Sequence, residues 1–130
     1  MTTAIALPST HTLPPAVEIP SFSLLGKKAL VTGGSRGIGR ACALALASVG
    51  ADVAVASSPA GVDSAENVCR SIRDMGRRAQ AFSFDVGMRS DLETMCARVK
   101  TDMEGVDILV NNVGVTRDRS IRKMDRGDWD

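Results

Sequence analysis

Tyrosine is absent from this sequence of 130 residues, and histidine and tryptophan occur once each. Chemistry that needs a tyrosine phenol therefore has no donor within these residues. The single histidine, His11, lies in a polar stretch near the amino terminus, which argues against a histidine-centred catalytic site. No uninterrupted apolar run approaches the roughly 18 residues that a membrane-spanning helix needs.

Cysteine is also scarce, since only Cys42, Cys69 and Cys96 occur, widely spaced and without a Cys-x-x-Cys pair. This odd set fits neither a disulfide framework nor a zinc site. It favours small buried or half-buried hydrophobic side chains in a reducing compartment. The first basic residue is Lys27, so the amino terminus lacks the positive charge of a secretory or mitochondrial targeting signal. We therefore expect a cytoplasmic protein.

Charge of one sign does not dominate, because sixteen Lys and Arg stand against fifteen Asp and Glu. This balance gives no electrostatic case for a nucleic acid or an anionic membrane as partner. Four of the five prolines fall in residues 1–20 among Thr, Ser and Ala. Such a composition buries too little apolar surface to offset its ordering entropy. We expect residues 1–24 to be a flexible leader and residues 25–130 to form the folded part.

From residue 28 onward, short apolar runs alternate with stretches of helical periodicity. The pattern predicts strands at 28–32, 52–56, 79–84 and 107–110, and helices at 38–49, 62–75 and 90–103. Strands that alternate with helices indicate an α/β protein whose parallel sheet has helices on both faces. Ligands of such sheets bind at the carboxyl ends of the strands.

Two of the predicted helices carry more specific signals. Asp63 with Glu66 three residues later has the form of a capping box at the start of the second helix. On the third helix, one face is predicted to hold Leu92, Met95, Cys96 and Val99.

The first strand leads directly into the segment Thr32-Gly-Gly-Ser-Arg-Gly-Ile-Gly39. Its glycines at 33, 37 and 39 permit a tight turn and let backbone N–H groups approach a ligand. The following helix directs the positive end of its dipole at this turn, which suits a pyrophosphate. The spacing G-x-x-x-G-x-G matches neither G-x-G-x-x-G nor the P-loop. An ordinary glycine-rich turn is the alternative, but the position between strand and helix favours nucleotide binding.

Three motifs occur in order, each after a predicted strand: the glycine segment, then Asp85-Val86, then Asn111-Asn-Val-Gly114. With these motifs the sequence resembles the short-chain dehydrogenase/reductase family over about residues 25–130. Position 113 holds Val where this family usually has Ala. The resemblance implies a Rossmann-type doubly wound parallel sheet, truncated after the fourth strand, with the strand order 3-2-1-4.

The resemblance also implies cofactor contacts for each motif. Asp85 would accept a hydrogen bond from the adenine amino group, with Val86 beside the ring. Taken alone, without the other motifs, Asp85 is explained equally well as a turn residue at the end of a strand. Asn111, Asn112 and Gly114 would hold the fourth strand and border the nicotinamide ribose. The residues implied to bind the cofactor are Gly33, Ser35, Arg36, Gly37, Ile38, Gly39, Ser57, Ser58, Asp85, Val86, Asn112, Val113 and Gly114.

The charges expected near the ribose 2′ position indicate which cofactor is bound. A site for NAD(H) places a carboxylate at the end of the second strand, roughly 20 residues past the glycines, where it binds the ribose 2′-hydroxyl. Ser57 and Ser58 occupy that place here, and Arg36 in the glycine turn can pair with a 2′-phosphate. We predict NADP(H) over NAD(H); the alternative is that Arg36 is a solvated surface charge.

The segments 115–118 and 124–130 most resemble 3-oxoacyl-carrier-protein reductases and acetoacetyl-CoA reductases. The implied activity is reduction of a 3-oxoacyl thioester, or a related ketone, in fatty acid metabolism. The cations near this segment would suit an anionic acyl carrier or CoA, but they equally form an ordinary solvated surface. These cations are Arg117, Arg119, Arg122, Lys123 and Arg126.

In this family a tyrosine donates the proton, paired with a lysine four residues later and with a serine and an asparagine. The sequence contains no such set, so the resemblance implies no catalytic residue and no metal in these 130 residues. We expect the amino-terminal fragment of a longer reductase that forms a homo-oligomer when complete. The alternatives are a nucleotide-binding module without catalysis and an inactive truncated product.

Overall fold

The computed structural model describes residues 21–116 and 118–129. Each predicted strand and helix is present, and most of their ends differ from the predicted ones by one residue. The elements are β1 (Lys28–Thr32), α1 (Gly37–Ser48), β2 (Asp52–Ser57), the 3-10 turn η1 (Pro59–Gly61), α2 (Val62–Asp74), β3 (Ala79–Ser83), α3 (Arg89–Asp102), β4 (Ile108–Val110) and α4 (Arg126–Trp129). Within the described part of the chain, no helix has the length and apolar character to cross a bilayer.

The expected leader falls largely outside the described residues. Leu24, at its predicted end, already belongs to the folded part. Its amide donates to the carbonyl oxygen of Val49 at 2.8 Å, and its side chain packs against the core.

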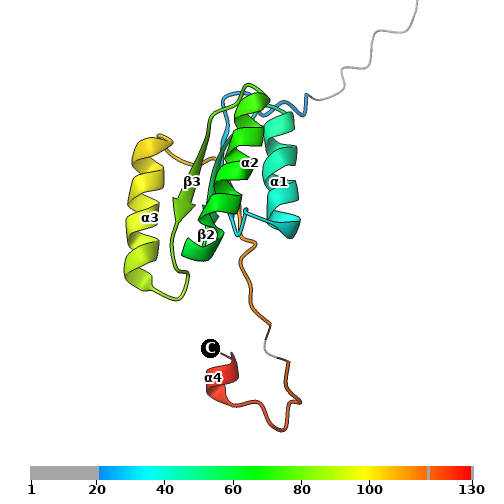
Figure 1. Ribbon diagram of the computed structural model, residues 1–130, viewed down its shortest axis with the longest axis vertical. Coiled ribbons are helices and arrows are strands. Elements are labelled where there is room, and N and C mark those ends of the chain that lie inside the picture. The colour runs from blue at the N-terminus through cyan, green and yellow to red at the C-terminus, as the bar shows by residue number, and fades with distance from the viewer. Residues whose placement is uncertain (1–20, 117, 130) are drawn as a thin grey trace, which may run out of the picture.

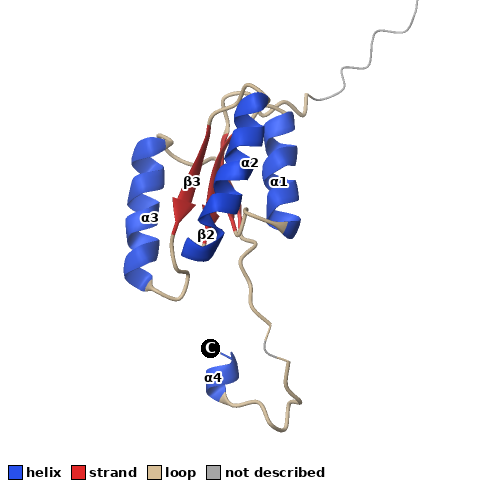
Figure 2. Ribbon diagram, viewed as in Figure 1, coloured by secondary structure: helices blue, strands red, loops and turns tan. Residues whose placement is uncertain are grey.

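The strands form one parallel sheet in the order β3-β2-β1-β4, which confirms the predicted fold class and strand order. Figure 1 shows α1 and α2 on one face of this sheet and α3 on the other. The same layers are visible by secondary structure in Figure 2. β4 pairs with β1 from Ala29–Ile108 to Val31–Val110 and forms an edge of the sheet.

Each face of the sheet has its own apolar core. On one face, Val31, Val53 and Val55 pack against small residues of α1 and against α2. On the other face, a second cluster joins Phe82 and neighbouring strand residues to Met95 and Val99 of α3. Every residue of β2 is buried, because this strand lies inside the sheet with helices on both sides.

The α3 face is incompletely covered next to β4. Leu109 of β4 is 55% exposed. The expectation that Cys96 is buried or half-buried with Met95 and Val99 is wrong, because Cys96 is exposed. Cys96 lines a groove beside Leu30 and Leu109, where no described helix other than α3 covers the sheet.

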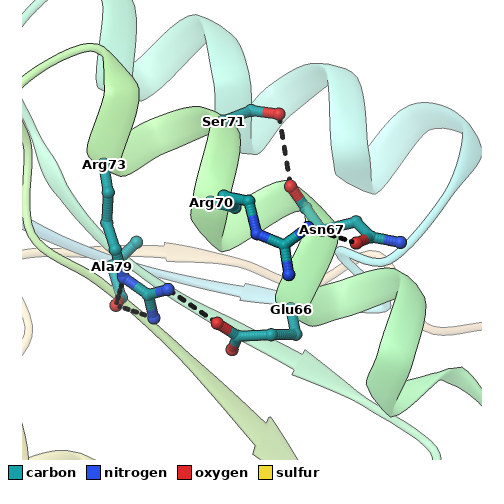
Figure 3. Close-up of polar contacts among 6 residues, drawn as sticks. All are labelled: Glu66, Asn67, Arg70, Ser71, Arg73 and Ala79. Atoms are coloured by element: carbon teal, nitrogen blue, oxygen red, sulfur yellow. Dashed lines mark hydrogen bonds and ion pairs between the residues drawn. The ribbon is translucent and has the colours of Figure 1, made fainter.

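The capping box predicted at the start of α2 is also wrong. The N-cap position is Gly61, and it has no side-chain capping hydrogen bond. Glu66 instead accepts from Arg73 Nη1 at 2.6 Å, as Figure 3 shows. Arg73 also donates from Nε and Nη2 to the carbonyl oxygen of Ala79, at 3.1 and 2.9 Å. The hydrogen bond with Glu66 raises the pKa of Arg73. The guanidinium of Arg73 connects α2 to the start of β3.

Candidate functional site

The glycine segment forms the turn between β1 and α1. Gly33 and Gly37 have φ values of 63° and 56°, in the left-handed region that favours glycine. α1 begins at Gly37 behind Arg36, which makes no side-chain capping bond, and the first turn carries no acidic residue. The N–H groups at the start of this helix are therefore not capped by a side chain, and the dipole there attracts anions.

The last glycine of the motif is required by packing. A Cβ added at Gly39 would overlap the carbonyl oxygen of Gly33 and lie 2.5 Å from Asn112 Nδ2. Gly34 is similarly confined, since a Cβ there would lie 2.9 Å from Val55 Cγ1. The helix thus packs directly on the turn that precedes it. Sequence reasoning did not single out Gly34.

The carboxyl ends of β1 and β4 are joined by Thr32 and Asn112. The Asn112 side chain donates to the carbonyl oxygens of Thr32 and Gly33, at 3.2 and 3.1 Å. The Asn112 amide donates to Thr32 Oγ1 at 3.0 Å, and this hydroxyl donates to the carbonyl oxygen of Val110 at 3.2 Å. Sequence reasoning gave Thr32 no role, although a hydroxyl at the last strand position before the glycines was a usable signal.

At the end of β2, the two serines differ in environment. Ser57 is 2% exposed, and its hydroxyl donates to the carbonyl oxygen of Ser58 at 3.2 Å. Ser58 is exposed. The turn η1 lies against the glycine turn, because a Cβ at Gly61 would be 3.1 Å from Ser35 Oγ. Arg36 is exposed, and its side chain makes no hydrogen bond or ion pair with any described residue.

Asp85 begins a tight turn after β3. Its Oδ1 accepts from the Gly87 amide at 2.8 Å, and its carbonyl oxygen accepts from the Met88 amide at 3.0 Å. Its own amide donates to Asp91 Oδ2 at 3.1 Å. Asp85 is thus a turn residue, yet within residues 21–116 and 118–129 its Oδ2 accepts no hydrogen bond. That oxygen is available to a ligand.

An open groove of about 510 Å³ runs from the carboxyl ends of the strands across the α3 face. It brings together Val86, Asn111, Val113 and Gly114 from two of the predicted motifs. Arg36 and Ser58 are not part of its lining. Val113 also lies close to the glycine turn: a Cβ added at Gly33 would be 3.3 Å from its Cγ2.

The segment after β4 leads away from the sheet to α4, as Figure 1 shows. Arg117, one of its cations, lies outside the described residues. Arg119 forms an ion pair with Asp128 at 3.2 Å, while Arg122 and Lys123 are exposed.

The sequence model of the family described as short chain dehydrogenase matches residues 27–130. A 3-oxoacyl-(acyl-carrier-protein) reductase, FabG from Staphylococcus epidermidis, is 40% identical over 106 residues, which are 82% of this chain and 43% of that protein. A dehydrogenase/reductase structure from Sinorhizobium meliloti 1021 has a TM-score of 0.76 at 38% identity, over 84% of this chain and 43% of that chain.

A short chain dehydrogenase from Burkholderia cenocepacia J2315, in complex with NADP, has a TM-score of 0.73 at 43% identity. The match covers 81% of this chain and 42% of that chain. This chain therefore spans less than half the length of the relatives that it matches.

Proposed function

The chain belongs to the short chain dehydrogenase family, and from this membership we propose that it is the cofactor-binding half of an NADP(H)-dependent oxidoreductase. The observation that carries the proposal is the glycine turn. Gly39 packs against the Gly33 carbonyl, whereas a Cβ at Gly37 would meet nothing within 4 Å. The turn is closed on its protein side and open at the start of α1, which fits a pyrophosphate group.

Each part of the site has a proposed task. The backbone N–H groups from Gly33 to Gly39 and the start of α1 hold the pyrophosphate. The free Oδ2 of Asp85 accepts from the adenine amino group, and Val86 lies beside the ring. Asn112 shapes the turn from the β4 side, and Gly114 borders the nicotinamide ribose.

NADP(H) is proposed over NAD(H) because of the residues after β2. A carboxylate there would bind the ribose 2′-hydroxyl and repel a 2′-phosphate, but Ser58 is the exposed residue at that place. Arg36 supplies an unpaired guanidinium in the glycine turn, suited to a phosphate group. The NADP complex of the Burkholderia cenocepacia relative supports this choice.

The substrate is proposed to be a 3-oxoacyl thioester or a related ketone, supported by the similarity to the staphylococcal reductase. When bound, NADPH supplies the hydride that converts the ketone to the 3-hydroxy form. The 130 residues contain no tyrosine and are assigned no catalytic residue. We propose that the proton donor belongs to the further residues of a complete reductase, and that this reductase is a cytoplasmic homo-oligomer.

Binding of NADPH and NADH to this chain tests the cofactor proposal. Replacing Arg36 by Ala should weaken NADPH binding roughly ten- to hundredfold, the worth of one charge-assisted contact, and leave NADH binding nearly unchanged. Arg40→Ala, an exposed arginine one helical turn later, is the matched control. Ser58→Asp should shift the preference toward NADH by adding a ribose acceptor and a repulsion. Equal losses for both cofactors in Arg36→Ala would contradict the assignment.

A further inference from the structure

Asp91 lies in the first turn of α3 and is half-buried. Its Oδ2 accepts a hydrogen bond from the backbone amide of Asp85, six residues earlier, at 3.1 Å. A carboxylate in the first turn of a helix interacts favourably with the helix dipole, and its oxygens are strong hydrogen-bond acceptors. This contact connects a rigid helix to the residue that carries the proposed adenine acceptor.

The turn that contains Asp85 is held from several sides. Before it, the amide of Phe84 donates to the carbonyl oxygen of Ser57 at 3.0 Å, which fixes the chain against β2. After it, the Gly87 and Met88 amides donate back to Asp85. Asp91 supplies the contact from α3. The backbone of Asp85 is thus held between a strand and a helix.

These hydrogen bonds use only one of the two carboxylate oxygens of Asp85. Oδ1 is used by the Gly87 amide, and Oδ2 has no partner in the described part of the chain. A carboxylate fixed through Oδ1 and through its own backbone presents Oδ2 as the oxygen without a protein donor, placed to accept from a ligand. Such a group distinguishes a ligand with an amino donor from one with a carbonyl at the same place, because the latter places two acceptors together.

We propose that Asp91 is a positioning residue for purine recognition, which holds Asp85 so that its free oxygen selects a 6-amino purine over a 6-oxo purine. The proposal rests on the proposed function, in which Asp85 accepts from the adenine amino group. It adds to that function an explanation of how Asp85 selects a 6-amino purine. Asp91 itself does not touch the nucleotide.

The test measures the dissociation constants of 5′-ADP and 5′-IDP for this chain and compares their ratio among variants. The unchanged chain should prefer ADP by about tenfold or more, the worth of one hydrogen bond to a charged group. Asp91→Ala should bring the ratio close to one. Asp91→Asn should keep most of the preference, because its amide oxygen still accepts from the Asp85 amide. Glu93→Gln, which breaks an exposed ion pair with Arg89 on the same helix, is the control and should change nothing.

If Asp91→Ala does not fold, Asp91→Glu replaces it. Its extra methylene moves the carboxylate away from the Asp85 amide while keeping the first-turn charge, and the ratio should still fall. A purely structural role would weaken both nucleotides together and leave their ratio intact.

Two outcomes separate this inference from the proposed function. A chain that prefers ADP, with a preference unchanged by Asp91→Ala or Asp91→Glu, would overturn the role of Asp91 and leave the proposed function standing. A chain that binds neither nucleotide, or binds both equally, would overturn the adenine contact of Asp85 and the inference with it.

Discussion

Asn112 Nδ2 donates a hydrogen bond to the carbonyl oxygen of Gly33 at 3.1 Å. The same carbonyl oxygen is the atom that a Cβ at Gly39 would overlap. One backbone group of the glycine turn is therefore held by the segment after β4 and packed against α1. Through it, the conformation of the glycine turn depends on residues from three separate segments.

Replacing Asn112 by Ala should lower the free energy of unfolding by about 1–3 kcal/mol. The substitution leaves the half-buried carbonyl oxygens of Thr32 and Gly33 without the Asn112 side chain that donates to both. Urea denaturation followed by circular dichroism measures the change. Asn111→Ala, at the exposed neighbouring residue, should have little effect on stability. Equal destabilisation by the two variants would show that the Asn112 contacts contribute nothing specific.

Gly39→Ala should destabilise the chain by about 1–3 kcal/mol and abolish nucleotide binding. The added Cβ cannot be accommodated unless the Gly33 carbonyl moves, and this carbonyl belongs to the turn proposed to bind the pyrophosphate. Thermal unfolding and NADPH titration measure the two effects. Gly114→Ala serves as the stability control, because a Cβ there would meet nothing within 4 Å. A fully stable Gly39→Ala chain would disprove the packing argument.

The stability of the chain should fall as the pH rises from about 9 to about 11. Burial, together with the negative charge of Glu66, raises the pKa of the Cys69 thiol to about 11. In the unfolded chain this thiol ionises near its ordinary pKa, so over that interval the unfolded state binds fewer protons than the folded state. Unfolding free energies at pH 8 and pH 10.5 test this expectation. In Cys69→Ala the contribution of this group to the pH dependence should disappear; an unchanged slope would assign it to other groups.

The isolated chain should self-associate through the edge at β4. Leu109 is 55% exposed on an edge strand beside an apolar groove, and such edges recruit other chains. Sedimentation velocity over a range of concentrations should therefore detect oligomers. Leu109→Lys should shift the distribution toward the monomer. Ile121→Lys, which replaces a more exposed residue far from the sheet along the chain, should leave it unchanged. A monomeric wild-type chain at all concentrations would refute this expectation.

The order of strands and helices could be predicted from the sequence because its signals are local. Apolar runs and helical periodicity lie within the elements that they define, and the terminating glycines Gly50 and Gly76 lie two residues beyond the ends of their helices. The glycine motif was equally readable, since Gly33 and Gly37 adopt conformations that glycine alone adopts readily. These features depend on neighbouring residues, and neighbours are visible in a sequence.

The two predictions that were wrong concern the partners and the burial of side chains. Asp63 and Glu66 have the spacing of a capping box, but Glu66 pairs with Arg73, two turns later on the same helix. The guanidinium of Arg73 is in turn held by the carbonyl oxygen of Ala79 in β3. Cys96 shares a helical face with buried residues, yet it is exposed because nothing described covers that end of the sheet. Helical periodicity shows which side chains lie together, but not what lies opposite them.

The sequence by itself determined the α/β order, the glycine turn and the chemical types at the strand ends. Only the tertiary structure decided which of these groups meet. Thr32 contacts Asn112 across 80 residues because β4 pairs with β1. The same packing buries Ser57 and leaves Ser58 exposed. Local conformation is set by short-range sterics, whereas these hydrogen bonds form only after hydrophobic burial has brought distant segments together.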